Sequence, residues 1–208
     1  MQPNDDNMNE LLSRVSAGSS GATQQLMQLH RGRLRRMVGA RLDRRLRSRL
    51  DPSDVVQDVL LKATRRLVSY SRNPQLPFYV WLRQIAWDRL MELHRQHVSV
   101  EKRSVAREAS FALPVSDESV DVLAEKLQGR EVSPVTNTLR KEMQRRTREA
   151  LDSLPGADCE LLVMRYVEQM KLHEIAAQLS LSESATKSRH LRALDKLRTL
   201  LDDNGESR

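Results

Sequence analysis

The chain has 208 residues, of which only 3% are aromatic, and it contains seven glycines and seven prolines. So few turn-forming residues favour helices and argue against a sandwich or a barrel. The net charge of +7 and the pI of about 10.0 favour a polyanionic partner such as nucleic acid. A single cysteine excludes an internal disulfide, and no apolar run reaches the roughly 20 residues of a membrane span, so we expect a cytoplasmic protein with no membrane partner.

Helical periodicity fills the first part of the chain. Nine arginines crowd into residues 31–49, where they form either a phosphate-binding surface or a solvated helix face. A helix starts at residues 50–54, because Pro52 suits a first helical turn and Asp51 or Ser53 can cap the free N–H groups. Residues 1–97 carry 17 basic and 9 acidic side chains, so most of the positive charge lies here. The predicted helices are 10–17, 22–49, 52–70 and 78–97, with a proline-bounded loop at 71–77.

Periodicity is lost between residues 98 and 138, which we interpret as a linker with one short helix at 117–128. Helical patterns then resume and predict helices at 138–154, 158–169, 172–179 and 182–201. The expected architecture is all-α. It consists of two small helical domains, 1–97 and 139–208, joined by the long linker 98–138.

The last two predicted helices fit a helix-turn-helix. Small residues, Ala176 and Ala177, stand where the helices would cross, and Ser182 is placed to cap the second helix. We expect apolar anchors at Ile175, Leu179, Leu181 and Leu191. Polar groups near the start of the second helix suit base edges and phosphates: Ser184, Lys187, Ser188, Arg189 and Arg192. A helical hairpin with a polar surface is the alternative.

A second candidate surface lies on the helix that begins at Pro52. Asp54, Gln57, Asp58 and Leu61 recur at helical spacing and share one side, which suits docking of a partner helix. A solvated face with ordinary charge pairs, such as Asp58–Lys62, explains the same pattern. The residues by themselves favour this second interpretation.

Four of the seven aromatic residues fall between residues 78 and 87. We expect Trp81 to belong to the core. The adjoining loop is placed to receive an unstacked base, with Tyr70 or Tyr79 as the stacking surface.

Catalysis is not expected, because no phosphate-binding loop, dinucleotide motif or nucleophile elbow is present. His94 and His97 are three residues apart, but only Glu92 stands near them. This is not a full ligand set, so we expect no metal and no cofactor.

Taken together and in order, these motifs resemble the extracytoplasmic-function sigma factors of bacteria. The segments that carry the resemblance are DPSDVVQDVLLKA (51–63), FYVWLRQIA (78–86) and LSESATKSRHLRAL (181–194). Two positions depart from the family pattern. Trp87-Asp88 replaces a usual Arg-Asn, and Ser180 replaces a usual turn glycine.

The resemblance implies a role for each predicted domain. Residues 1–97 would be sigma region 2 and residues 139–208 sigma region 4. The partners would be core RNA polymerase, through its beta-prime clamp helices and beta flap, and promoter DNA. The implied polymerase-binding residues are Asp54, Gln57, Asp58 and Leu61. Those implied to melt the upstream element and hold a flipped base are Tyr70, Arg72, Asn73, Tyr79, Arg83, Gln84, Asp88 and Arg95. Those implied to read the distal element are Ser184, Lys187, Ser188, Arg189 and Arg192.

We therefore expect a dissociable initiation factor that directs core polymerase to a two-part promoter. A stand-alone helix-turn-helix regulator and an adaptor that sequesters a partner through helical faces are the alternatives. Many members of the family are held by an anti-sigma factor. Whether such a factor or the linker regulates this chain is left open by the sequence.

Overall fold

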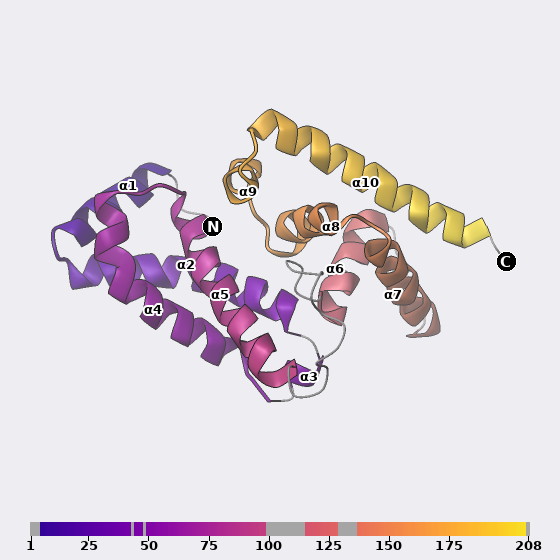
Figure 1. Ribbon diagram of the computed structural model, residues 1–208, viewed down its shortest axis with the longest axis horizontal. Coiled ribbons are helices and arrows are strands. Elements are labelled where there is room, and N and C mark those ends of the chain that lie inside the picture. The colour runs from indigo at the N-terminus through magenta and orange to yellow at the C-terminus, as the bar shows by residue number, and fades with distance from the viewer. Residues whose placement is uncertain (1–4, 43, 48, 99–114, 129–136, 207–208) are drawn as a thin grey trace. The chain divides into compact units, whose positions relative to one another are not determined.

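The computed structural model describes residues 5–42, 44–47, 49–98, 115–128 and 137–206, and all regular structure in these ranges is helical (Figure 1). The predicted all-α class is confirmed. The chain divides into two compact units, one formed by Met1–Gly39 and Arg45–Val100, the other by Ala40–Arg44 and Glu101–Arg208. Residues 99–114 and 129–136 of the predicted linker lie outside the described residues.

The first unit is built mainly from four helices. The short α1 ends before Gly18, whose φ of 87° suits a residue without a side chain. The predicted arginine-rich helix is shorter than expected, since α2 ends at Arg41 and a separate turn of helix, α3, follows it. The helices are α1 Asp5–Ser16, α2 Ser20–Arg41, α3 Arg44–Arg47, α4 Pro52–Arg72 and α5 Phe78–Val98.

Helices α4 and α5 pack against each other and position the first candidate site. The start of α4 is as predicted: Pro52 is its first residue, and the Asp51 carboxylate accepts a hydrogen bond from the Ser53 amide at 2.6 Å. That bond also holds the pKa of Asp51 below its usual value. The buried side of α4 carries Val59 and Ala63, both 0% exposed. Its opposite side is therefore left to solvent.

The second unit contains the remaining helices. Helix α6 lies inside the predicted linker, yet it packs against α7 and the π-helical turn η1, with Val120 and Leu123 fully buried. The short helix was predicted; its packing into this unit was not. The elements are α6 Asp117–Gln128, α7 Asn137–Asp152, α8 Gly156–Leu162, η1 Val163–Val167, α9 Leu172–Leu179 and α10 Glu183–Glu206.

The single cysteine, Cys159, lies half-buried on α8. Burial raises the pKa of its thiol to about 11. None of the helices in the described ranges combines the length and apolar character needed to cross a membrane.

Candidate functional site

The residues predicted to dock a partner helix follow the outer side of α4. Asp54 and Gln57 are exposed, and Leu61 is 53% exposed. Val68, two turns further along, is 44% exposed and extends the same side. Single surface leucines are ordinary, but two apolar side chains in line behind a polar start make a surface suited to a partner helix.

Asp58 differs from its neighbours on this side because it is already paired within the unit. Its Oδ2 atom lies 2.6 Å from Nε of Arg89 on α5 and 3.9 Å from Nζ of Lys62. The pair with Lys62 follows from helical spacing and was predicted. The shorter pair with Arg89 was missed, because sequence spacing does not show which residues meet across two helices.

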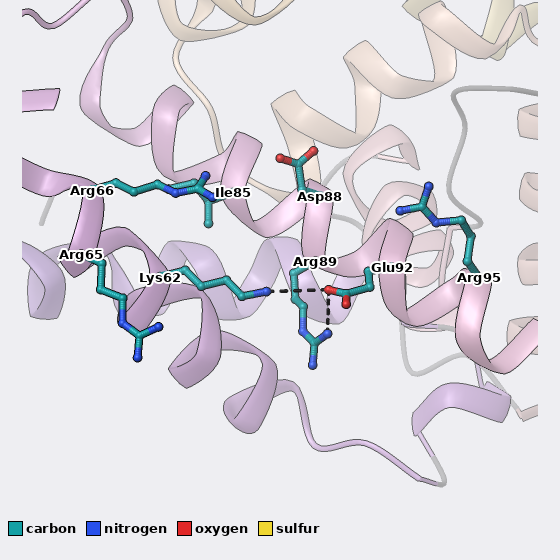
Figure 2. Close-up of a pocket in the computed structure, with 8 residues that line it drawn as sticks. All are labelled: Lys62, Arg65, Arg66, Ile85, Asp88, Arg89, Glu92 and Arg95. Carbon is teal, nitrogen blue, oxygen red and sulfur yellow. Dashed lines mark hydrogen bonds and ion pairs between the residues drawn. The ribbon is translucent and has the colours of Figure 1, made fainter. Parts of the chain in front are cut away.

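Arg89 extends this ion-pair network to a second carboxylate. Its Nη1 donates to Oε2 of Glu92 at 2.8 Å, and Lys62 Nζ lies 3.7 Å from the same oxygen (Figure 2). The hydrogen bond from Arg89, followed by the charges nearby, lowers the pKa of Glu92. Glu92 therefore stays charged at neutral pH, and the carboxylates of Asp58 and Glu92 both lie beside Arg89 and Lys62.

A groove of about 530 Å³ runs between α4 and α5 beside these pairs (Figure 2). Arg65 and Arg66 enter it from α4, and within the described part of the chain neither has an ionic or hydrogen-bond partner. The lining combines five cationic side chains, two carboxylates and one apolar side chain, Ile85. The lining residues are Lys62, Arg65, Arg66, Ile85, Asp88, Arg89, Glu92 and Arg95.

The loop between α4 and α5 is held by Tyr70. Its hydroxyl donates to the carbonyl of Leu76 at 2.7 Å, and its ring stacks on Trp81 with centroids 4.5 Å apart. Burial raises the pKa of Tyr70 to about 12. Trp81, expected in the core, is only half-buried. The outer surface of the stack is therefore provided by Trp81.

Two residues predicted on the exposed side of α5 are buried. Tyr79 is 1% exposed and its hydroxyl donates to the carbonyl of Arg33 at 3.4 Å, while the Arg33 guanidinium covers its ring at 3.5 Å. Arg83 is 2% exposed, with its guanidinium 5.2 Å from the Trp87 ring centre. The prediction of Tyr79 as a stacking surface, and of Arg83 as a solvent-facing contact, is therefore wrong in placement.

Among the other residues predicted to engage the upstream element, the prediction of Tyr70 as an open stacking surface is also wrong. Tyr70 is 8% exposed and already stacked, so its face is not open to a base. Solvent-exposed positions are occupied by Arg72, Asn73, Gln84, Asp88 and Arg95.

The predicted helix-turn-helix is formed by α9 and α10. Ser180 closes α9 in a left-handed conformation with φ of 55°, and its amide donates to the carbonyl of Ala176. The amide of Leu181 donates to the same carbonyl at 2.9 Å. Ser182 then caps α10 as predicted, since its hydroxyl accepts from the Ala185 amide at 3.1 Å.

The exposed side of α10 carries most of the residues predicted to contact DNA, which are Ser184, Lys187, Ser188 and Arg192. Two predicted anchors are wrong: Leu181 is 36% and Leu191 is 56% exposed. The buried side is instead formed by Thr186, Ala193 and Leu197. Helical spacing places Leu191 one turn beyond Lys187 and Ser188, at an angle between the two, on the exposed face.

Arg189, another predicted contact, is bound to a side chain of a different helix. Its Nε donates to Oδ1 of Asp158 on α8 at 2.6 Å, and its side chain is 32% exposed. The neighbouring His190 shares a hydrogen bond of 3.0 Å with the Tyr166 hydroxyl. Burial lowers the pKa of His190, which favours the neutral imidazole. Together these bonds fix the orientation of α10 against α8 and η1.

Comparison with known proteins identifies the two units. A family model described as Sigma-70 region 2 matches residues 26–99, and one described as Sigma-70, region 4 matches residues 150–199. The first match contains α4, α5 and the groove. The second contains the helix-turn-helix.

Curated relatives agree. The chain is 24% identical over 193 residues to the "ECF RNA polymerase sigma factor SigD" of Mycobacterium tuberculosis, covering 93% of this chain and 83% of SigD. It is 27% identical over 148 residues to the "Probable RNA polymerase sigma factor RfaY" of Xanthomonas campestris, covering 71% of this chain and 33% of RfaY. It is 31% identical over 84 residues to FliA of Salmonella typhimurium, covering 40% of this chain and 34% of FliA. The chain thus spans about a third of the length of RfaY and of FliA.

A solved structure shares the fold. It is CnrH in complex with the cytosolic domain of CnrY, with a TM-score of 0.52 and 24% identity over 94% of this chain and 97% of CnrH. With regions 2 and 4 both present, the chain belongs to the sigma-70 family of RNA polymerase sigma factors, as its resemblance to the extracytoplasmic-function group implied.

Proposed function

We propose that this chain is a dissociable sigma factor that binds core RNA polymerase and directs it to start transcription at particular promoters. It supplies binding and recognition, and it acts in the cytoplasm without a cofactor or a catalytic group of its own. The observation that carries the proposal is the side of α4 on which Leu61, 53% exposed, follows Asp54 and Gln57.

That side of α4 is the proposed contact with the beta-prime clamp helices. An exposed leucine next to carboxylate and amide groups gives a partner helix both an apolar contact and charged positions that select its register. Region 4, in the second unit, is the proposed partner of the beta flap.

Promoter DNA is the proposed second partner, and each of the two units binds one of the two promoter elements. In the first unit the loop residues Arg72 and Asn73, with the exposed side of α5, engage the melted upstream element. In the second unit, α10 enters the major groove of the distal element, where Lys187 and Arg192 contact phosphates or base edges. The limits 1–97 and 139–208 remain our proposed extents of the two domains.

The direct test is run-off transcription on genomic fragments with core polymerase, with and without this protein. Leu61→Ala is expected to weaken binding to core polymerase, measured by co-purification, by about five- to thirtyfold, because truncating a central apolar contact costs roughly 1–2 kcal/mol. Leu29→Ala is the matched control, since Leu29 is 37% exposed on α2, away from the docking side. If Leu61→Ala and Leu29→Ala bind core polymerase equally well, α4 is excluded as the docking helix.

A stand-alone regulator is the alternative, and the same assay separates the two. Such a protein binds a palindromic duplex tightly as a dimer without polymerase. A sigma factor gives specific transcripts only when core polymerase is present. The structural neighbour CnrH is bound to the cytosolic domain of CnrY, which supports including a regulatory partner protein, of the anti-sigma kind, in the proposal.

A further inference from the structure

The fold divides the arginine-rich part of the chain into buried and exposed residues. Arg33 and Arg41 are buried, with 6% and 1% of their surface exposed. Arg31, Arg35 and Arg36 lie on the solvent side of α2, where all three are exposed. The two interpretations of this segment, a phosphate-binding surface and a solvated helix face, are therefore decided by these three residues.

The exposed arginines share one side of α2, which we call the arginine side and define by Gln28, Arg31, Gly32, Arg35 and Arg36. At 3.6 residues per turn, Gln28, Gly32 and Arg35 follow one another along a line, and Arg31 and Arg36 flank it. A Cβ atom added at Gly32 would meet no other group within 4 Å, so the middle of this side is open. A long, stiff partner can therefore approach the helix closely along this line.

A fourth arginine continues the line at the end of the helix. Gly39 falls on the same line about three turns beyond Gln28, and Nη2 of Arg47 on α3 donates to its carbonyl oxygen at 2.7 Å. This bond holds a positive charge at the last turn of α2, where the helix dipole is negative. The cationic surface is therefore assembled from two helices, and it extends about 16 Å from Gln28 to Gly39 at 1.5 Å per residue.

No acidic side chain of α2 balances these charges, because its 22 residues include no aspartate or glutamate. Solvated helix faces usually alternate the two signs of charge, but Arg31 and Arg36 make no ion pair or hydrogen bond among the described residues. Arg31 and Arg35 are four residues apart, a spacing at which like charges repel. The carboxylate of Asp51 lies within the field of Arg35, but its lowered pKa is due first to the hydrogen bond from Ser53. A bound polyanion would remove the repulsion between the arginines.

The side chains on this side favour a double-stranded polyanion. Helix α2 contains no Phe, Trp or Tyr, and its one histidine, His30, is 2% exposed. Unpaired bases are bound by stacking on aromatic rings, which this side lacks. The phosphates of a duplex are bound by arginine and glutamine side chains alone. A length of about 16 Å corresponds to roughly five phosphates of one strand of duplex DNA.

We propose that the arginine side of α2, together with Arg47, binds the phosphate backbone of duplex DNA without reading its sequence. The surface goes beyond the proposed function, because it lies on a helix that carries neither the docking residues of α4 nor the promoter residues of α5 and α10. Backbone contacts of this kind let a protein stay on DNA and slide along it between specific sites.

The test measures the affinity of the full chain for a fluorescent DNA duplex of mixed sequence, by anisotropy, without polymerase and at several salt concentrations. Arg31→Gln and Arg36→Gln are each expected to lower the slope of log affinity against log salt by about 0.9, the effect of one lost phosphate contact on B-DNA. Arg14→Gln removes the same charge from an exposed position on α1 and should leave the slope unchanged. If the slopes of both α2 variants equal that of Arg14→Gln, the proposal is wrong and α2 presents only a solvated face.

A carboxylate placed in the middle of the arginine side provides a second variant. Gln28→Glu is expected to weaken duplex binding severalfold, because the new charge repels the phosphates that lie along the line. Ser13→Glu adds the same charge at an exposed position on α1 and is the matched control. Equal weakening by the two variants would show that net charge alone sets the affinity, and it would overturn the site.

The class of polyanion is identified by repeating the measurement with other probes. Duplexes of different sequence should lose affinity by the same factor in Arg31→Gln and Arg36→Gln, because phosphate contacts carry no sequence information. If the same two variants lose as large a factor for oligothymidylate, duplex RNA or polyglutamate, the assignment to duplex DNA is wrong.

These outcomes are independent of the docking test. If the α2 variants match their controls while Leu61→Ala loses polymerase, the backbone surface fails and the proposed function stands. If Leu61→Ala keeps its polymerase binding while the α2 variants lose slope as expected, the docking assignment fails and the backbone surface stands.

Discussion

Leu191 is an apolar side chain in the middle of a polar surface. It is 56% exposed on α10, with Lys187, Ser188 and Arg192 around it. An exposed leucine side chain makes no favourable contact with water. The apolar group that a major groove offers to it is the C5-methyl group of thymine. Leu191 is therefore the residue of this face best suited to distinguish thymine from cytosine.

We expect Leu191→Ala to weaken polymerase-dependent transcription from a selected promoter by about fivefold, which corresponds to the loss of about 1 kcal/mol of apolar contact. The free energy of unfolding should stay within about 0.5 kcal/mol, since the side chain is exposed. The measurement is run-off transcription on templates in which the thymines of the distal element are replaced by deoxyuridine.

On the deoxyuridine template, transcription with the unchanged protein should fall by the same factor as transcription with Leu191→Ala falls on the normal template. Transcription with Leu191→Ala should fall no further on the deoxyuridine template. An equal further loss in the variant would show that Leu191 does not contact a thymine methyl.

Arg189 illustrates a different kind of residue, one whose position depends on another side chain. Asp158 on α8 holds it at 2.6 Å. We expect Asp158→Asn to reduce promoter-dependent transcription several-fold while polymerase co-purification is unchanged. It should also lower the free energy of unfolding by about 1 kcal/mol or less, the range for partly exposed ion pairs.

Arg189→Lys separates the two effects, because lysine keeps the charge but not the planar fork of donors. This variant should retain most of the stability and lose most of the transcription. A variant that loses stability and keeps transcription would assign Arg189 to structure alone.

At the scale of the elements, the turn between α9 and α10 combines a strained residue with a favourable cap. Ser180 adopts φ of 55°, where a non-glycine residue costs roughly 1–2 kcal/mol, and Ser182 caps the next helix. The cost is tolerated because the turn brings the amides of Ser180 and Leu181 onto the carbonyl of Ala176. The geometry of the turn thus depends on a left-handed backbone conformation at Ser180, which the Cβ atom of serine disfavours.

Two substitutions in this turn should have opposite effects on the unfolding free energy, measured by urea denaturation. Ser180→Gly should raise it by about 0.5–1 kcal/mol, since the relief of strain exceeds the added freedom of the unfolded chain. Ser182→Ala should lower it by about 1 kcal/mol through loss of the cap. A decrease for Ser180→Gly would show that the turn is not strained at Ser180.

Over the whole molecule, the helix limits that depend on local signals were predictable. Pro52 begins α4, and α9 covers Leu172–Leu179, because caps and turns act within a few residues of the chain. The π-helical turn Val163–Val167 was not predictable. Its bond from the Glu168 amide to the Val163 carbonyl depends on how the second unit packs.

The candidate sites were predictable where helical spacing alone decides the exposed side, as for Asp54, Gln57 and Leu61. The candidate sites were not predictable where packing against a second helix decides which side chains are exposed. Tyr79 and Arg83 are buried inside the first unit, where Arg33 covers the Tyr79 ring. Leu191 is exposed because α10 turns Thr186, Ala193 and Leu197 inward. In both places the sequence alone does not show whether the side chain is buried or exposed, because packing against a second helix decides it.

The lone Cys159 has a practical consequence for work on the intact chain. With a thiol pKa of about 11, only roughly one molecule in ten thousand carries the reactive thiolate at neutral pH. A second cysteine placed at an exposed position would react with maleimide dyes far faster than this native one. The unmodified background is therefore ready for single-site fluorescent labelling, and a dye on α10 would report in real time when that helix meets a promoter.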